Sequence, residues 1–303
     1  MKVSWVSYRL RLRTPLRISR STMAGRDAMR VTVTDDDGMT GHGEVVSSVY
    51  LGMEAGVRAA YDAALHDLRG KRAGVPVHRL LGLPDPTPVA TAYTIGLVDP
   101  ALVDVPPGFG VLKVKAGDEY DPERIAAVRR AAPEARLLID PNGGWTPART
   151  LRLLDELAWC RIEMVEQPIP PGTPARLAWI SERTDVPIVA DEDAATEADV
   201  DRLAGAVAGI NIKLAKCGGI APALRLATKA RAAGMEIMLG CLVASTLGIA
   251  PAVHLAGLAR WVDLDGHLLL AGDPYTGIGG HDGFLRLTGS PGLGVDLEKV
   301  SVP

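Results

Sequence analysis

The stretch "VLKVKAG" (residues 111–117) places Lys113 and Lys115 inside a short run that otherwise has the composition of a core β-strand. Side chains alternate in direction along a strand, so both lysines point to one side and Leu112 and Val114 point to the other. A buried ammonium group is costly unless it is paired. The face that carries the two lysines must therefore meet water or carboxylates supplied by other parts of the chain.

Charged residues recur at the ends of further strand-like runs at an almost constant spacing. Lys115 begins a series with intervals of 25, 26, 25, 25 and 25 residues, which continues through Asp140, Glu166, Asp191, Lys216 and Cys241. The next strand-like run, "RWVDLDG", contains Asp263 and Asp265. Strand ends are often polar because loops are polar, but this explains only one or two such residues. Five charged residues in register on successive strands therefore indicate a shared site.

Helical patterns separate these runs, and several begin with Asp or Thr followed by Pro, a helix start signal. They span residues 121–133, 146–159, 173–184, 196–207, 220–234 and 247–259. Strand and helix alternating at a fixed period predict parallel βα units, which with right-handed crossovers close into a barrel of the TIM type. An open doubly wound sheet is the structural alternative. In a TIM barrel the active site lies at the C-terminal ends of the strands, where the charged series falls.

Residues 1–92 do not follow the repeat. They begin as a β-meander with a hairpin turn at "DDDG" (35–38), and helical patterns follow at 56–74 and 77–83. We expect a separate α+β domain over residues 1–92 and the barrel over residues 93–282. The tail, residues 283–303, holds a candidate strand, "LRLTG", and is expected to return to the first domain.

Composition describes an ordinary globular protein. The chain has 303 residues, of which 47% are hydrophobic, and a net charge of −3. Neither nucleic acid nor an anionic membrane is expected as a partner. We find no secretory signal and no run of about 18 apolar residues. The odd number of cysteines, without metal-type spacing, predicts buried thiols in a reducing compartment, the cytoplasm.

Asp140, Glu166 and Asp191 would converge from three consecutive strands as an oxygen-only ligand set. Carboxylates without histidine or cysteine favour Mg²⁺ or Mn²⁺ over zinc. The alternative is an acid cluster that the lysines alone neutralise.

Lys115 and Lys216 flank the acidic trio and would face each other across the barrel mouth. This arrangement suits proton transfer on two sides of a substrate carbon. A lysine can act as a base when neighbouring cations favour its uncharged form, and Lys113 and the metal would both lie beside Lys115. Strand alternation places Lys213 with Asn211, so we expect Lys213 to lie away from the position of Lys216.

These residues resemble the enolase superfamily, in its muconate-lactonizing-enzyme-like subgroup. The shared motifs are "LKVKAG", "IDPNGGW", "MVEQP", "ADED" and "NIKLAKCGG", which together span nearly the whole barrel. The resemblance implies a modified (β/α)7β barrel closed by an α+β capping domain that the N-terminal segment and the C-terminal tail form. It also implies that Lys115 and Lys216 are catalytic, that Lys113 assists substrate binding, and that Asp140, Glu166 and Asp191 hold Mg²⁺.

The "VDLDG" segment is similar to that of the dipeptide epimerases, in which an Asp-x-Asp pair binds the α-ammonium group of the substrate. Asp263 and Asp265 share one strand face, so they can grip a cation together. A surface pair of aspartates is the alternative. The stretch "PLRISRST" resembles the specificity loop of that group, which makes Arg20 a candidate for contact with the substrate.

The chain departs from the family pattern in three places. The segment before "AGVRAAYDAALHDL" lacks most of the capping helices, and residues 97–110 leave little room for a full first barrel helix. In "IDPNGGW", Pro141 stands where many relatives have alanine. The first two departures weaken inferences about substrate specificity most.

Three functions fit these observations. The first is a Mg²⁺-dependent epimerase that inverts the α-carbon of a dipeptide's C-terminal residue through an enolate. The second keeps the scaffold for another reaction, as in o-succinylbenzoate synthase, a cycloisomerase or an N-acylamino acid racemase; the Asp263 and Asp265 pair argues against the lyases, whose substrates have no ammonium group. The third is a non-catalytic barrel, which the complete set of lysines and acids argues against. The sequence is compatible with a homo-oligomer and leaves the identity of the dipeptide open.

Overall fold

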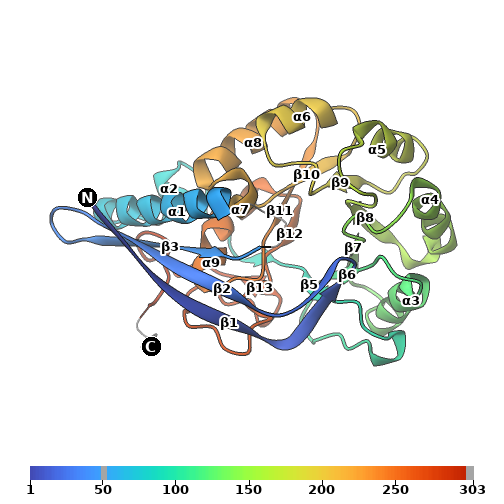
Figure 1. Ribbon diagram of the computed structural model, residues 1–303, viewed down its shortest axis with the longest axis horizontal. Coiled ribbons are helices and arrows are strands. Elements are labelled where there is room, and N and C mark those ends of the chain that lie inside the picture. Colours follow the sequence, from blue (N-terminus) through green and yellow to red (C-terminus); the bar gives the residue numbers. More distant parts are fainter. Residues whose placement is uncertain (49–52, 298–303) are drawn as a thin grey trace.

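A parallel barrel forms the centre of the computed structural model, which describes residues 1–48 and 53–297. Its eight strands are hydrogen-bonded in chain order (Figure 1): β5 (Tyr93–Ile95), β6 (Val111–Lys115), β7 (Arg136–Asp140), β8 (Ile162–Glu166), β9 (Ile188–Ala190), β10 (Gly209–Ile212), β11 (Glu236–Gly240) and β12 (Trp261–Asp263). The backbone N–H of Ala92 donates to the Val262 carbonyl at 2.9 Å, which links the two end strands. The predicted barrel is therefore confirmed, and the open sheet was the wrong alternative.

Helices cover the outside of the barrel at the predicted positions (Figure 1): α3 (Asp121–Ala131), α4 (Pro147–Glu156), α5 (Pro174–Ser181), α6 (Glu197–Leu203), α8 (Ile220–Ala232) and α9 (Thr246–Val253), with the short turns η2 (Ala158–Cys160) and η3 (Ala256–Leu258). Thr196 and Asp199 form a capping box at the start of α6. Between β5 and β6, a single 3₁₀ turn, η1 (Pro100–Leu102), stands where the first barrel helix would lie. The segment between these strands is thus too short for a full first barrel helix, as predicted.

Strand alternation divides the barrel interior into an apolar floor and a polar rim. The floor is a cluster of buried side chains that point inward: Ala92, Val111, Leu138, Met164, Val189, Met238 and Trp261. On each strand, the residue two positions after the floor residue also points inward. It lies one layer closer to the C-terminal ends of the strands. The residues there include Lys113, Asp140, Glu166, Asp191 and Asp263, so the packing of the floor fixes the height of the charged rim.

The N-terminal part is an antiparallel sheet with a long helix against it. Its strands are β1 (Lys2–Ile18), β2 (Ser21–Thr34) and β3 (Thr40–Val46), and the predicted turn at residues 35–38 joins the last two. The helices are α1 (Met53–Ala73) and α2 (Val77–Leu80). A Cβ at Gly41 or Gly43 would lie 2.0 Å from a carbonyl oxygen of α1. These glycines therefore let α1 pack directly on β3.

The C-terminal tail returns toward this part of the molecule. Its strand β13 (Phe284–Leu285) pairs with β4 (Val89–Ala90), and Leu293 N donates to Asp67 Oδ1 on α1 at 2.8 Å. Of the predicted strand "LRLTG", only Leu285 is in a strand, because β4 offers a partner only two residues long. Residues 298–303 of the predicted tail lie outside the described residues.

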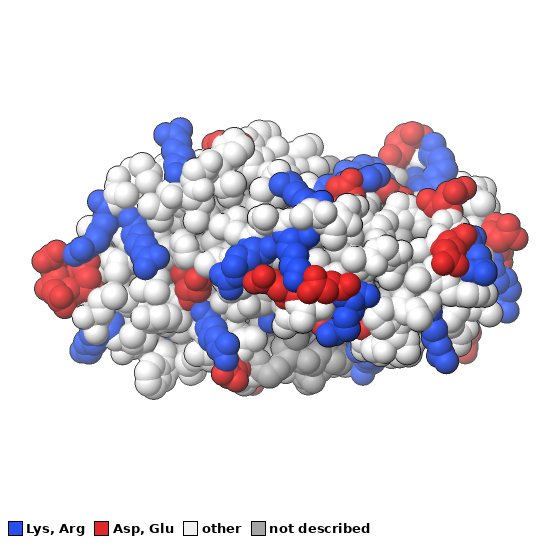
Figure 2. Space-filling model, turned by 90° about the horizontal axis from the view of Figure 1, so that it is seen from above, with Lys and Arg blue, Asp and Glu red and all other residues white. Residues whose placement is uncertain are grey.

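The cysteines are free, but only Cys160 is buried, while Cys217 and Cys241 are half-buried. The prediction of three buried thiols was therefore correct only for Cys160. Among the described residues, no helix combines the length and the apolar character that a membrane span requires. Acidic and basic side chains are interspersed over the face shown in Figure 2.

Two buried histidines join α2, the end of α9 and the tail. The rings of His78 and His254 stack with centroids 5.5 Å apart, and His254 Nε2 lies 3.3 Å from the Leu293 carbonyl oxygen. Burial lowers the pKa of His254 to about 4 and also lowers the pKa of His78. Both rings are therefore neutral at pH 7.

Replacement of His254 by Gln should reduce the loss of stability in acid. The pKa of His254 is lower in the folded state, so its contribution is present above the unfolded pKa of 6.5 and is lost as the pH falls toward 4. Between pH 7 and pH 5 the wild-type chain should lose about 2 kcal/mol of unfolding free energy that the His254→Gln variant does not lose. Urea unfolding at both pH values measures the difference.

The control is His281→Gln, which removes a histidine from an exposed position. It should follow the wild-type profile. Equal losses in the wild-type chain and in His254→Gln would show that His254 does not couple folding to pH.

Candidate active site

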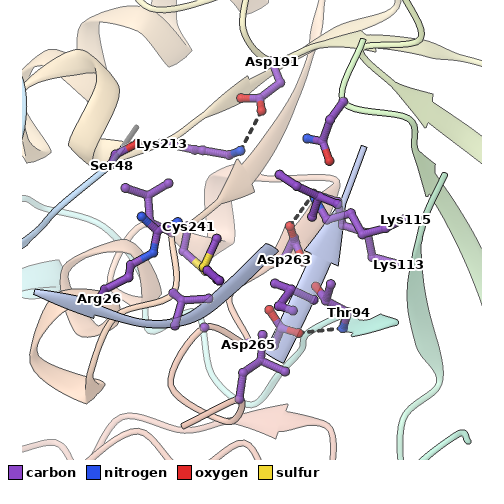
Figure 3. Close-up of a pocket in the computed structure, with 18 of the residues that line it drawn as sticks. Arg26, Ser48, Thr94, Lys113, Lys115, Asp191, Lys213, Cys241, Asp263 and Asp265 are labelled. Carbon is purple, nitrogen blue, oxygen red and sulfur yellow. Dashed lines mark hydrogen bonds and ion pairs between the residues drawn. The ribbon is translucent and has the colours of Figure 1, made fainter. Parts of the chain in front are cut away.

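A cavity lies at the C-terminal ends of the barrel strands, beneath the turn between β1 and β2. Its empty volume is about 800 Å³, a figure that includes open solvent at the mouth. The barrel contributes mainly charged side chains, and the N-terminal sheet contributes Leu16, Ile18, Arg20, Met23, Arg26 and Ser48. Figure 3 shows Lys113 and Lys115 on one side of this cavity and Lys213 on the other.

The Lys113 ammonium group lies at the base of the site among three carboxylates from three strands. Its Nζ is 3.1 Å from Asp140 Oδ2, 2.6 Å from Glu166 Oε2 and 2.7 Å from Asp263 Oδ2. Burial alone would favour the neutral amine, but the three negative charges outweigh it and raise the pKa of Lys113 well above its usual value. The first of the two strand lysines is therefore a permanent cation that joins opposite walls of the barrel.

Lys115 and Lys216 each contact one acid of the predicted metal trio. Lys115 Nζ donates to Asp140 Oδ2 at 2.6 Å, and Lys216 Nζ donates to Asp191 Oδ1 at 2.5 Å. Burial opposes the ionisation of both acids, but the neighbouring lysine charges hold the pKa of each carboxyl well below its usual range. For Lys216 the balance is reversed, since burial lowers its pKa despite the charge of Asp191. Lys216 thus gives up a proton more readily than an ordinary lysine.

The structure corrects two expectations about the second lysine pair. Lys216 lies on a one-turn helix, α7 (Leu214–Cys217), rather than at a strand end. Lys213 was expected to lie away from the position of Lys216, yet its Nζ is 2.6 Å from Asp191 Oδ2, and Lys216 contacts the same carboxylate. It shares the inward face of the chain with Asn211, whose Nδ2 donates to Glu166 Oε1 at 2.7 Å. A buried asparagine in a core strand needs a partner, and this signal could have identified both residues.

Gln167 positions the third acid of the trio and is not among the residues predicted from the sequence. Its Oε1 accepts the backbone N–H of Asp191 at 3.0 Å, and its Nε2 donates to Asp193 Oδ2 at 2.8 Å. The residue is buried and has a φ of 36°, in the left-handed region. This conformation turns the chain directly after β8 so that the side chain reaches β9.

Asp140, Glu166 and Asp191 end or directly follow three adjacent strands and are all buried. Within the described residues, no carboxylate, imidazole or thiol groups form a preset metal cluster, and these acids are turned onto lysines. The pKa of Glu166 is raised by burial and by the charges of Asp140 and Asp191 on either side. Three mutually repelling oxygen donors of this kind fit a hard divalent cation such as Mg²⁺.

Asp263 and Asp265 lie across the barrel from this trio. Asp263 is already paired with Lys113, while its Oδ1 is buried and has no hydrogen-bond partner among the described residues. Asp265 Oδ2 accepts the backbone N–H of Thr94 at 2.6 Å, and burial together with the charge of Asp263 raises its pKa to about 7. Figure 3 shows both side chains at the edge of the cavity. They can accept further hydrogen bonds from a cationic ligand.

Arg20 lies in the turn between β1 and β2, at the mouth of the cavity. Its guanidinium group forms an ion pair with Glu192, which follows Asp191. Next to it, Ser19 packs against Gly117 and Gly144 of the barrel rim. The turn thus lies directly on the strand ends, and the charge of Arg20 is neutralised by the barrel.

The order of the strands gives the site two perpendicular axes. Lys115 lies on β6 and Lys216 follows β10. These strands are four positions apart in the ring of eight, so the two lysines lie on opposite sides. Glu166 on β8 and Asp263 on β12 are opposite by the same count. A small molecule in the cavity would have a lysine on each side, an acidic trio at one end and an aspartate pair at the other.

Residues 101–301 match the family model described as "Enolase C-terminal domain-like". The chain is 30% identical to an L-Ala-D/L-Glu epimerase from Bacteroides thetaiotaomicron, over 97% of this chain and 88% of that protein. It is 35% identical to a hydrophobic dipeptide epimerase from Roseobacter litoralis, over 97% and 98%.

Solved structures show the same similarity over the whole fold. The L-Ala-D/L-Glu epimerase from Bacillus subtilis, in a substrate-liganded complex, superposes with a TM-score of 0.90 at 27% identity, covering 97% of this chain and 98% of that one. A dipeptide epimerase from Enterococcus faecalis, complexed with Mg and L-Leu-L-Tyr, gives 0.89 at 29% identity with the same coverage.

Replacement of Lys113 by Met should destabilise the fold strongly at neutral pH. The substitution keeps the apolar stem but removes the cation that three buried carboxylates share. Removal of one partner from a buried charged network typically costs about 3–5 kcal/mol. Urea unfolding at pH 7 gives the loss.

A surface pair provides the matched control. Lys229 Nζ lies 2.6 Å from Asp201 Oδ2 on the outside of the barrel, and Lys229→Met should cost less than about 1 kcal/mol. Similar losses in the two variants would contradict a central role for Lys113.

Proposed function

Because this chain belongs to the enolase superfamily, whose C-terminal domain model it matches, we propose that it is a Mg²⁺-dependent dipeptide epimerase. The reaction is an isomerisation that inverts the α-carbon of the C-terminal residue. The observation that carries the proposal is the placement of Lys115 and Lys216 on opposite sides of a cavity with an acidic trio at one end and an aspartate pair at the other.

The two axes of the site support one orientation of a dipeptide. The terminal carboxylate lies toward the trio, and the α-ammonium group lies toward Asp263 and Asp265. The α-carbon of the C-terminal residue is then between the two lysines. The acceptor atoms that support this orientation are Asp263 Oδ1, which is buried without a hydrogen-bond partner among the described residues, and the carboxylate of Asp265.

Each lysine serves one face of the α-carbon. One lysine, as a neutral amine, removes the α-proton, and the other, as an ammonium group, delivers a proton to the opposite face. The next turnover in the same direction requires each lysine to exchange its proton with water. The lowered pKa of Lys216 supports its role as a base, and its contacts with Asp191 and the Asn211 carbonyl hold its Nζ in place.

Mg²⁺ held by Asp140, Glu166 and Asp191 would supply positive charge beside the substrate carboxylate, where negative charge develops as the α-proton leaves. Lys113 holds Asp140 and Glu166 from below and keeps Asp263 toward the cavity. Gln167 fixes the backbone of Asp191. The N-terminal sheet lines the cavity on the side away from the barrel floor, with Leu16, Ile18 and Met23 among its residues. Free cysteines suit a reducing compartment, and we place the enzyme in the cytoplasm.

Epimerisation of dipeptides in D₂O tests this proposal. The wild-type enzyme should interconvert the two diastereomers of a dipeptide and incorporate deuterium at the C-terminal α-carbon, both visible by ¹H NMR. Lys115→Ala and Lys216→Ala should each lower the epimerisation rate by roughly 10²–10⁴-fold, because each removes the acid or base on one face. Each variant should still exchange the α-proton of one diastereomer.

The surface variant Lys229→Ala serves as the control and should retain the wild-type rate. Undiminished epimerisation in either site variant would contradict the two-lysine assignment. No turnover of any dipeptide by the wild-type enzyme would contradict the proposed function.

Acetylation of the substrate amine should weaken catalysis. An N-acetylated dipeptide has no ammonium group for Asp263 and Asp265, and loss of this charge-assisted contact should cost on the order of 2–3 kcal/mol. The expected result is a decrease in kcat/KM of roughly 30–150-fold relative to the free dipeptide. Equal turnover of both compounds would instead favour an N-acylamino acid racemase.

A further inference from the structure

Lys216 lies beyond the end of a barrel strand, on a segment that cannot hold its own shape. Its helix, α7, consists of the four residues Leu214–Cys217, and a single helical turn is unstable in isolation. Gly218 and Gly219, with φ of 95° and 125°, then turn the chain into α8. The position of the Lys216 backbone therefore depends on the contacts that fix the two ends of this segment.

The barrel fixes the first end. The chain enters α7 directly after β10, and the backbone N–H of Lys216 donates to the Lys213 carbonyl oxygen at 2.8 Å. Lys216 Nζ also donates back to the Asn211 carbonyl oxygen at 3.0 Å. The second end, the start of α8, lies instead against α1 of the N-terminal part, which packs beside α7 and α8 (Figure 1).

Asp62 on α1 caps the start of α8. Its Oδ2 accepts the backbone N–H of Ile220, the first residue of α8, at 2.6 Å. Gly219, the residue before the helix, has no side chain for this purpose, and a Cβ there would lie 2.5 Å from Asp62 Oδ2. The Asp62 carboxylate thus takes the place of an N-cap side chain, and its negative charge is favourable at the positive end of the helix dipole.

His66, one turn further along α1, helps to hold Asp62 in this position. Its ring is buried, and its Nδ1 lies 2.8 Å from the Asp62 carbonyl oxygen and 3.4 Å from Asp62 Oδ2. The carboxylate therefore has a partner on its own helix as well as on α8. Asp62 does not line the cavity, so it can act on the reaction only through the segment that carries Lys216.

The turn after Lys115 is held by a different part of the molecule. Lys115 lies within β6, and the backbone N–H of Gly117 donates to both carboxylate oxygens of Asp121, at 3.0 and 2.9 Å. Asp121 is the first residue of α3, so this contact is made within the barrel. A carboxylate of the barrel therefore supports one lysine, and a carboxylate of the N-terminal part supports the other.

Resting on the proposed epimerase function, we propose that Asp62 is a positioning residue for Lys216. By fixing the start of α8 it fixes the end of α7, and with it the place of Lys216 Nζ relative to the substrate α-carbon. Because Lys115 serves the opposite face, Asp62 supports proton transfer at one face of the α-carbon only.

Exchange of the α-proton in D₂O, followed by ¹H NMR for each diastereomer separately, resolves the two faces. The probes are L-Ala-L-Glu with L-Ala-D-Glu and L-Leu-L-Tyr with L-Leu-D-Tyr, and the pair that the wild-type enzyme interconverts faster is used. The diastereomer that Lys216 serves is the one whose exchange is lost in Lys216→Ala. In Asp62→Ala its exchange should fall roughly 10- to 100-fold, as expected when a reacting group is displaced by about 1 Å.

Exchange of the other diastereomer should stay within about threefold of wild type in Asp62→Ala, which also reports that the variant is folded. Gly219→Ala, whose added methyl group would displace the Asp62 carboxylate, should show the same one-sided loss. Asp62→Asn keeps a hydrogen-bond acceptor and should restore most of the exchange. The surface variant Asp155→Ala, at an exposed position on α4, should match the wild-type enzyme at both faces.

Equal losses at both faces in Asp62→Ala would overturn the inference, because they indicate a general effect on the fold. Unchanged exchange at both faces, or a loss confined to the face that Lys115 serves, would also overturn it. In each of these cases the wild-type enzyme still epimerises a dipeptide, so the proposed function stands. Failure of the wild-type enzyme with both pairs of dipeptides would overturn the function and this inference together.

Discussion

The arrangement of the charged rim depends on the Lys113 ammonium group. It is buried beneath the cavity within 3.1 Å of carboxylates from β7, β8 and β12. Without it, Asp140, Glu166 and Asp263 would be concentrated at one level of a low-dielectric interior, where the carboxyls would take up protons or the barrel would open. With it, the three carboxylates share one positive charge and can face the cavity as ligands. The same side chain thus stabilises the barrel and holds the carboxylates of its rim in place.

The N-terminal sheet completes this rim from above and is itself fixed by a half-buried acid. Glu44 on β3 accepts hydrogen bonds from the Ser245 backbone and hydroxyl at the start of α9 and from the Tyr8 hydroxyl. Burial raises the pKa of Glu44 to about 7. These bonds set the distance between the sheet and the barrel, and with it the position of Arg26 relative to the lysines. Both parts of the molecule therefore line the cavity, the barrel mainly with charged side chains and the sheet with Leu16, Ile18 and Met23 among others.

Regular spacing along the chain made most of the barrel predictable. Each βα unit has nearly the same length, so charged residues at this spacing fall at the ends of successive strands. This placed Lys115, Asp140, Glu166 and Asp191 on the same rim of the barrel. Lys213 was misplaced because strand alternation cannot show that the chain turns into α7 directly after it, which brings Lys213 and Lys216 together on Asp191. The contact of Lys113 with Asp263 could not be foreseen either, since it exists only when β12 closes the barrel against β5, the neighbour of β6. The roles of these residues in catalysis remain predictions.

A crystal structure with Mg²⁺ and a dipeptide tests the arrangement most directly, because the proposed reaction depends on how the acids and the two lysines surround one carbon atom. We expect oxygen atoms of Asp140, Glu166 and Asp191 at about 2.0–2.2 Å from the metal ion. We also expect Lys115 Nζ and Lys216 Nζ on opposite faces of the α-carbon, each within roughly 3–3.5 Å. Both lysines on one face, or acids that point away from a common centre, would contradict it.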